Sequence, residues 1–155
     1  MEYAIVTVSQ KTFFSRLIQL FTWSKWNHVA FYINKYNYRG VIAEVNFNGV
    51  QFFSLKEYCK DKDVRIHKNT PNIKDLRQTL HFIFKNKNKK YDFFRTLFFF
   101  YKKKNIDDKS KWNCIEFIEE IFRDQGVELF NGEKLTPGQI NKRLSSDEDL
   151  IFLRK

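Results

Sequence analysis

The stretch Trp112-Asn113-Cys114-Ile115-Glu116-Phe117-Ile118 decides the fold, because it places a cysteine at the start of a helix. Asn113 is a favourable N-cap residue, and Glu116 stands three residues later, as in a capping box. Apolar residues then recur at helical spacing, and Gly126 is a typical residue for ending a helix. We therefore predict a helix over residues 111–126 with Cys114 in its first turn.

A cysteine in the first turn of a helix is stabilised as a thiolate, since unpaired backbone N–H groups and the helix dipole favour negative charge there. The same N–H groups can stabilise an oxyanion that forms on an attacked carbonyl. A lone cysteine is also a common small residue of a hydrophobic core. At this point Cys114 is a nucleophile or a core residue, and its place behind an N-cap makes the two interpretations equally reasonable.

Upstream, the sequence predicts a β-hairpin. Residues 27–33 are strand-like, a polar loop ends at Gly40, and residues 41–47 form a second strand. Antiparallel pairing across a loop centred near Asn37 requires that the numbers of paired residues sum to about 74.

This register brings a histidine and a glutamate together. His28 faces Asn46, and Glu44 is the diagonal neighbour on the same face, because side chains alternate along a strand. A carboxylate there can hold one ring nitrogen and leave the other to accept a thiol proton. The alternative is an edge-strand Glu44 facing water and a His28 that only packs.

The combined pattern resembles the circularly permuted papain-like cysteine hydrolases, the NlpC-type superfamily in its YiiX-like branch. Three segments carry the resemblance, namely Asn27-His28-Val29-Ala30-Phe31, Ala43-Glu44 and residues 112–118, and two shorter ones agree, Tyr91-Asp92 and Leu135-Thr136-Pro137-Gly138. The resemblance implies an α+β fold in which a small antiparallel sheet packs against the Cys-bearing helix, with residues 1–155 as one domain.

The same resemblance implies roles for residues. Cys114 would be the nucleophile, His28 the general base and Glu44 the orienting third member of the triad. Tyr91 and Asn113 are secondary candidates for the oxyanion site or the cleft wall. No metal and no cofactor is implied. The expected substrates are peptide or isopeptide bonds, including those of cell-wall peptides, and lipid acyl esters, cleaved or transferred, are the alternative.

Composition agrees with one folded domain. The chain has 155 residues, of which 43% are hydrophobic and 18% aromatic, which excludes a disordered chain. We see no signal peptide and no membrane-spanning run, and the two cysteines, Cys59 and Cys114, are far apart. We therefore expect free thiols in a reducing, cytoplasmic compartment. His67 and His81 have no neighbouring acid or ligand at metal spacing and are predicted to be non-catalytic.

The formal charge of +10 raises the question of a partner. Basic runs at 85–90 and 102–104 bracket the aromatic run 93–100. This pattern suggests either a binding surface for an anionic membrane or cell wall, or two solvated loops around a core helix. We favour the solvated loops. Nucleic acid is disfavoured because no recognition motif occurs. A non-catalytic basic module that binds nucleic acid or membrane remains the alternative to an enzyme. The oligomeric state is not determined.

A cell-wall substrate for a cytoplasmic protein would require release by lysis, as for a phage or viral protein, or action in a host cell.

Other elements follow from periodicity and turn residues. We expect strands at 3–9, 50–53, 64–68 and 149–153, and helices at 12–22, 54–59, 137–144, from an Asn72 cap to about 86, and after Tyr91-Asp92. In the helix at 12–22, Phe13, Leu17 and either Leu20 or Phe21 should point inward, with Arg16 and Gln19 outward. Trp23 and Trp26 either line the cleft beside the imidazole or close the core.

Overall fold

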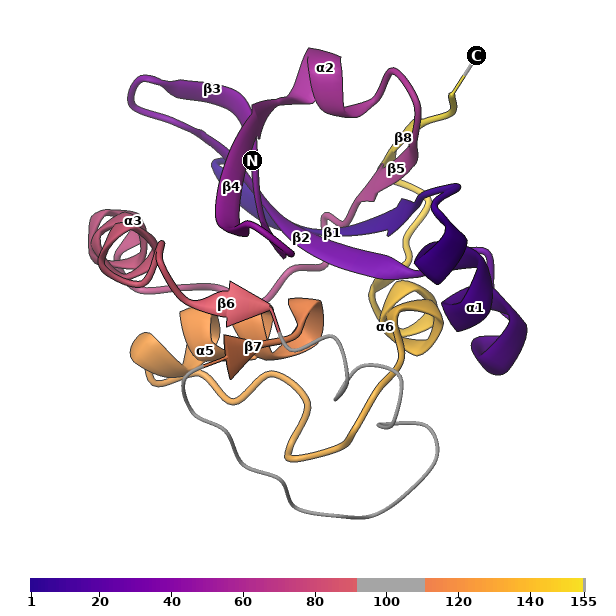
Figure 1. The fold of residues 1–155 in the computed structure, drawn as a ribbon. Helices are drawn as coiled ribbons and strands as arrows, with labels where there is room; N and C mark the ends of the chain where they lie inside the picture. The colour runs from indigo at the N-terminus through magenta and orange to yellow at the C-terminus, as the bar shows by residue number, and fades with distance from the viewer. Residues whose placement is uncertain (92–110, 155) are drawn as a thin grey trace.

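The computed structural model describes residues 1–91 and 111–154. Its centre is an antiparallel sheet of six strands in the order β4-β3-β2-β1-β5-β8 (Figure 1). These strands are β1 (Tyr3–Ser9), β2 (His28–Lys35), β3 (Tyr38–Asn46), β4 (Gly49–Ser54), β5 (Asp63–Ile66) and β8 (Leu150–Phe152). A short parallel pair, β6 (Lys90–Tyr91) and β7 (Lys111–Trp112), forms a second sheet, and its strand β6 lies against β3 and β4. The helices are α1 (Phe13–Thr22), α2 (Leu55–Tyr58), α3 (Leu76–Lys85), α5 (Cys114–Asp124) and α6 (Pro137–Leu144).

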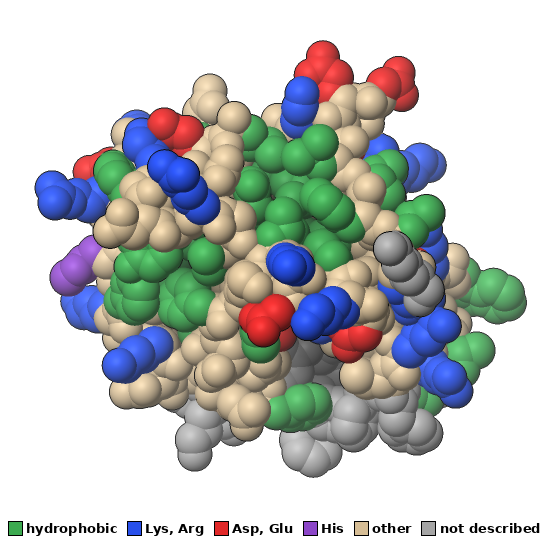
Figure 2. Space-filling model, turned by 90° about the horizontal axis from the view of Figure 1, so that it is seen from above, with side chains coloured by type: hydrophobic (Ala, Val, Ile, Leu, Met, Phe, Trp, Pro, Cys, Tyr) green, Lys and Arg blue, Asp and Glu red, His purple; other side chains and the backbone are tan. Residues whose placement is uncertain are grey.

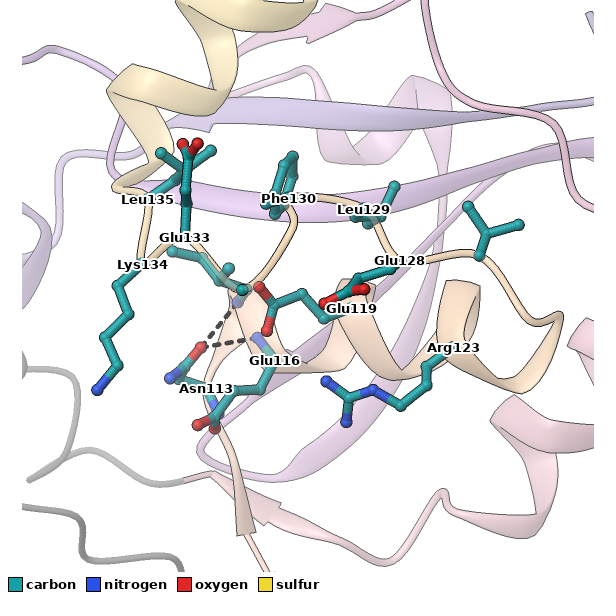
Figure 3. Close-up of a pocket in the computed structure, with 13 residues that line it drawn as sticks. Asn113, Glu116, Glu119, Arg123, Glu128, Leu129, Phe130, Glu133, Lys134 and Leu135 are labelled. Carbon is teal, nitrogen blue, oxygen red and sulfur yellow. Dashed lines mark hydrogen bonds between the residues drawn. The ribbon is translucent and has the colours of Figure 1, made fainter.

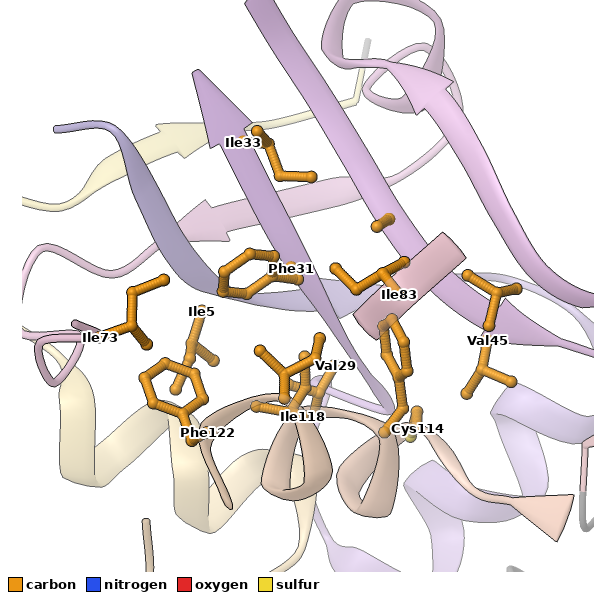
Figure 4. Packing of buried hydrophobic residues seen from close by; sticks show 14 of the residues in the cluster. Ile5, Val29, Phe31, Ile33, Val45, Ile73, Ile83, Cys114, Ile118 and Phe122 are labelled. Atoms are coloured by element: carbon orange, nitrogen blue, oxygen red, sulfur yellow. The ribbon is translucent and has the colours of Figure 1, made fainter. Parts of the chain in front are cut away.

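The helices lie on opposite sides of the sheet. In Figure 1, α3, α5 and α6 lie below it and α2 crosses above it. The larger hydrophobic cluster joins the lower face to α5, where Phe31 of β2 meets Phe122 of α5 edge to face at 6.2 Å (Figure 4). The predicted α+β class, with the Cys-bearing helix against an antiparallel sheet, is confirmed. Burial of this aromatic pair helps to hold α5 under β2.

The upper face of the sheet has its own cluster, built around Tyr58 of α2. Figure 2 looks down on this face and shows hydrophobic side chains gathered in its middle. Alternation explains the division: Val29 and Phe31 belong to the lower cluster, while Ala30 and Tyr32 between and after them belong to the upper one.

The hairpin register is the predicted one. Phe31 pairs with Ala43 and Tyr32 with Ile42, so the partner numbers sum to 74. The strands run further than expected, because β2 continues to Lys35 and β3 begins at Tyr38, which leaves a tight turn instead of a loop that ends at Gly40.

Two local expectations need correction, and one open alternative is narrowed. Asp75, not Asn72, caps α3, because its carboxylate accepts hydrogen bonds from the amides of Arg77 and Gln78. Of the two alternatives for the inward position, Leu20 is ruled out because it is 71% exposed. Gln19, which was expected to point outward, is half-buried, and its side-chain amide donates to the carbonyl of Lys25. The sequence pattern of the helix does not predict where Lys25, beyond its end, will lie.

The two tryptophans near the start of β2 differ. Trp26 is buried, whereas Trp23 is 96% exposed and neither closes the core nor packs in a cleft. The helix expected after Tyr91-Asp92 lies outside the described residues, as do the aromatic run 93–100 and the basic run 102–104.

The predicted helix at 137–144 is confirmed as α6. Thr136 caps it in a capping box, and Pro137 occupies its first turn, where a missing N–H costs nothing. Gly138 is needed for packing, because a Cβ there would overlap with the side chain of Ser24. This close approach joins α6 to the segment that leads from α1 into β2.

Candidate active site

The Cys-bearing helix has Asn113 as its N-cap, as predicted, but it begins at Cys114, because Lys111 and Trp112 form strand β7 and do not belong to the helix. The side-chain oxygen of Asn113 accepts hydrogen bonds from the amides of Ile115 and Glu116, both at 2.9 Å. The Glu116 carboxylate returns a bond by accepting from the Asn113 amide at 2.9 Å. This complete capping box makes Cys114 the first residue of α5, with only 3% of its surface exposed.

The amide of Cys114 itself stands out among the first-turn donors. Asn113 takes up the amides of Ile115 and Glu116 through its side chain and that of Phe117 through its carbonyl. Within the described part of the chain, the Cys114 N–H has no such acceptor. It is therefore the backbone donor of this turn that remains available to a bound oxyanion.

The hairpin presents His28 and Glu44 as a buried pair. Nε2 of His28 lies 2.9 Å from Oε2 of Glu44, and the two residues are 7% and 5% exposed. The ring N–H is not aligned for a directional hydrogen bond, so the contact is chiefly one of opposite charges. Burial of a charge is costly, and such a pair persists only where further groups satisfy it.

Two further groups hold the Glu44 carboxylate. The side-chain amide of Asn46 donates to Oε1 at 3.1 Å, and the hydroxyl of Tyr58 donates to Oε2 through a short hydrogen bond. Tyr58 comes from α2 and is fully buried. Each carboxylate oxygen thus has a hydrogen-bond donor, and Oε2 also lies beside the imidazole.

The charges of the site follow from these contacts. Burial lowers the pKa of His28, but the neighbouring Cys114 and Glu44 outweigh it and raise that pKa to about 10. Burial raises the pKa of Glu44, but the imidazole and the bonds from Tyr58 and Asn46 lower it to about 2. The pKa of Tyr58 is raised well above its usual value by burial and by the adjacent Glu44. At neutral pH the site holds an imidazolium and a carboxylate.

Cys114 completes the row. It opens α5, which packs against β2 and β3, and it lies close enough to His28 to raise the pKa of the imidazole. The structure thus brings together Cys114, His28 and Glu44, which are up to 86 residues apart in the sequence (114 − 28). Asn113 lies beside them, with its side-chain oxygen engaged in the cap. The side chain of Tyr91 lies outside what the structure describes.

Sequence reasoning assigned no role to Asn46 and missed Tyr58. The hairpin register already placed Asn46 opposite His28, so its proximity to Glu44 on the same strand face was accessible from the alternation of side chains. Tyr58 had no such signal, because its position depends on how α2 crosses the sheet.

A second histidine site occupies another part of the sheet. Nδ1 of His67 lies 3.1 Å from Oδ2 of Asp149, and its Nε2 lies 2.9 Å from the hydroxyl of Thr7. Arg65 also binds Asp149, at 2.8 Å. Burial lowers the pKa of His67, and the charge of Arg65 adds to this effect against Asp149. His67 has no acidic residue near it in the sequence, but the fold places Asp149, the residue before β8, beside its ring. The ring is nevertheless neutral.

The other cysteine has a different setting. Cys59 is half-buried at the end of α2, and burial raises the pKa of its thiol to about 11 despite nearby Lys62. Both Cys59 and Cys114 are free thiols.

A cavity of about 210 Å³ lies on the other side of α5 (Figure 3). Ile115, Glu119 and Arg123 of that helix line it, together with Leu129 and Phe130 of the following loop. None of the three candidate triad residues lines this cavity. Among the described residues, no group of three or more His, Cys, Asp or Glu side chains is placed to hold a metal ion.

Comparison with known proteins now identifies the relatives. Residues 4–148 match the family described as permuted papain-like amidase enzyme, YaeF/YiiX, C92 family. The fold is similar to the crystal structure of the metalloprotein yiiX from Escherichia coli O157:H7, with a TM-score of 0.61 and 13% identity over 99% of this chain and 97% of that one. Among curated proteins, none matches the sequence.

Proposed function

The chain belongs to the permuted papain-like amidase family, and from this premise we propose that it cleaves amide bonds with a Cys114–His28–Glu44 triad. The single observation that carries the proposal is the buried cluster in which Nε2 of His28 lies 2.9 Å from Glu44 and the neighbouring Cys114 raises the pKa of the same imidazole.

The first step is activation of the thiol. His28 takes the proton of Cys114, and the raised pKa of the imidazole means that this proton stays on the ring at neutral pH. Glu44 balances the resulting imidazolium. Because Glu44 occupies Nε2, Nδ1 is the ring nitrogen that serves the thiol.

Attack and release then use the same groups. The thiolate adds to the substrate carbonyl, and the N–H of Cys114 donates a hydrogen bond to the oxyanion. The imidazolium of His28 protonates the leaving amine as the C–N bond breaks, which leaves an acyl thioester on Cys114. A water molecule, deprotonated by His28, hydrolyses the thioester and restores the free thiol.

The substrate class follows from the family. We propose a peptide or isopeptide bond, with cell-wall peptides as one source, and we retain lipid acyl esters as the alternative that shares the same acyl thioester. Within the described residues, no helix is long and apolar enough to cross a bilayer.

Acyl-enzyme trapping tests the proposal. The protein is incubated with a panel of peptide amides, isopeptides and acyl-lipid esters, quenched in acid and analysed by intact and peptide mass spectrometry. We expect an acyl adduct on Cys114 from an amide substrate, and no turnover in Cys114→Ala. Cys59→Ser is the matched control and should retain both the adduct and turnover.

Two outcomes would contradict the proposal. Turnover that survives in Cys114→Ala would remove Cys114 as the nucleophile. Adducts from esters alone would replace the amidase by the lipid acyl-ester alternative. Alkylation by iodoacetamide gives a second readout, because Cys114 should react well below pH 8 and Cys59, with its raised pKa, far more slowly.

A further inference from the structure

The outer stripe of α1 is unusual for a protein surface. Arg16, Leu20 and Trp23 follow one another at spacings of four and three residues, so they lie on one side of the helix. All three point to solvent, with Leu20 71% and Trp23 96% exposed. Figure 2 shows hydrophobic side chains projecting, beside Lys and Arg side chains, at the edge where α1 lies.

The backbone at Trp23 makes its exposure more informative. Trp23 ends α1 in the left-handed region, with φ 52° and ψ 33°. Glycine is the usual residue there, because a side chain costs conformational energy in that region. The indole recovers nothing from packing, since it is almost wholly in water. Strain and exposure at one residue together indicate a role outside the fold.

The charged residues on α1 and directly beside it in the sequence are all basic. Lys11, Arg16 and Lys25 are exposed on or beside α1. From Tyr3 to Ala43 the chain has five basic residues and no Asp or Glu. Such a surface attracts an anionic partner and repels a second copy of itself.

We propose that Arg16, Leu20 and Trp23, with Lys11 and Lys25, form a docking surface for an anionic lipid bilayer. Trp and Leu enter the headgroup boundary, where an amphipathic indole is most stable, while the basic side chains contact lipid phosphates. A nucleic acid fits less well, since the aliphatic Leu20 offers neither a stacking face nor a hydrogen bond. The proposal is independent of the amidase activity.

This surface differs from the basic runs that the sequence first suggested for an anionic partner. In the run 85–90, Lys89 lies over the ring of Trp112 at 4.0 Å, so it packs against the core cluster. The Lys87 carbonyl lies against Gly49, which also ties this run to the fold. Residues 85–90 are therefore held by packing within the fold, whereas the exposed Leu20 and Trp23 of α1 are not.

Vesicle binding of the full chain tests the proposal. Sucrose-loaded vesicles of phosphatidylcholine with about one third phosphatidylglycerol, or of phosphatidylcholine alone, are sedimented with the protein at low and at high salt. We expect partitioning to the anionic vesicles to be at least tenfold stronger than to neutral ones. About 0.5 M salt should reduce it several-fold, because salt screens the attraction between surface charges. Equal partitioning to both vesicles, or none to the anionic ones, would overturn the proposal.

Tryptophan fluorescence localises the contact. The chain has three tryptophans, and Trp26 and Trp112 are buried. A blue shift on addition of anionic vesicles therefore reports Trp23. The shift should vanish in Trp23→Phe, which should still bind. A blue shift of unchanged size in Trp23→Phe would overturn the proposal.

Trp23→Gly separates docking from folding. Glycine relieves the backbone strain, so Tm should be unchanged or higher while vesicle partitioning falls at least fivefold. Leu20→Ser and Arg16→Glu should lower partitioning as well. Leu153→Ser, at a residue 64% exposed, and the exposed Lys142→Glu are matched controls that should bind like the wild type. Vesicle binding that is undiminished in Trp23→Gly would overturn the proposal. So would a result in which a duplex DNA oligonucleotide competes with the vesicles for the protein and vesicles cause no blue shift of the Trp23 fluorescence.

Discussion

Two buried histidines in this molecule each lie beside a carboxylate, yet their surroundings favour opposite charge states. The pKa of His28 is raised to about 10 because Cys114 and Glu44 together outweigh burial. The pKa of His67 is lowered because burial dominates and Arg65 counteracts the acid beside it. An adjacent carboxylate therefore does not by itself make an imidazolium; the charge of the next neighbour decides.

The third partner differs as well. Cys114 opens a helix, and its own amide has no acceptor in the described part of the chain. Thr7 lies in the middle of β1, paired with Val29 on one side and Arg65 on the other, and its buried hydroxyl donates to Asn141. A hydroxyl, an imidazole and a carboxylate in a row thus serve a structural role where they have no oxyanion donor beside them and no substrate can reach them.

The largest expected effect separates the two histidines by activity. His28→Ala should lower kcat/KM by about 10³-fold, within the range for a general base. His67→Ala should leave kcat/KM of the folded enzyme within about threefold of wild type. Activity should be measured at a temperature where circular dichroism shows both variants folded. A folded His67→Ala enzyme as impaired as His28→Ala would remove the distinction.

The two carboxylates should differ in the same sense. Asp149 accepts hydrogen bonds from Arg65, Ser146 and the amide of Lys68, besides its contact with His67. Asp149→Ala should therefore reduce the free energy of unfolding by about 3 kcal/mol, as for a broken buried ion pair. Urea denaturation measures this loss.

The matched substitution on the other side is Glu44→Gln. It keeps the shape and the bonds to Asn46, so stability should fall less than in Asp149→Ala, while kcat falls by about 10²-fold. An unchanged kcat in Glu44→Gln would show that the negative charge of Glu44 has no role in catalysis.

How far sequence reasoning reaches can be judged from these residues. The capping box at Asn113 and the hairpin register of His28 and Glu44 were predictable, because caps and alternation are local rules. The contacts of Tyr58 and Asp149 were not, since each depends on where a distant segment crosses the sheet.

Ambiguous local signals account for the errors. The sequence analysis placed the cap of α3 at Asn72, whereas the structure uses Asp75, which is an equally favourable capping residue. In α1 the pattern offered Leu20 or Phe21 as inward residues, and Leu20 proves to be exposed. Periodicity ranks faces of a helix but does not say which residue a neighbouring element will cover.

A smaller effect should come from Tyr58→Phe. The hydroxyl that donates to Glu44 is lost, while the buried ring stays in the upper cluster. We expect kcat to fall about tenfold and the alkylation rate of Cys114 to fall with it, as expected for one hydrogen bond to a charged group. The control is Thr7→Val beside His67, which should leave both rates unchanged. Equal effects of the two substitutions would contradict a positioning role for Tyr58.

The smallest expected effect is a pH dependence of opposite sign. The stabilisation from His28 is complete below about 6.5, its usual pKa, and is lost as the pH rises toward about 10. That from His67, whose pKa is lowered, is present above about 6.5 and is lost as the pH falls.

Urea denaturation of His28→Gln and His67→Gln between pH 5 and 9.5 (about the span of both titrations) tests this. The difference in unfolding free energy from wild type should shrink toward high pH for His28→Gln and toward low pH for His67→Gln. Each slope is limited to about 1.4 kcal/mol per pH unit, the value for one proton. Slopes of the same sign would refute the contrast.

The pairing of β5 with β8 has a consequence for biosynthesis. Residues 64–66 bond to residues 150–152, so the outer edge of β5 stays open until the ribosome has released almost the entire described chain. An unpaired strand edge in a nascent polypeptide can recruit other strands and aggregate. β8, the last described strand, covers this edge of β5 and leaves a short edge of three residues in its place, which is less open to intermolecular pairing. Variants that loosen β8 should therefore accumulate as insoluble material.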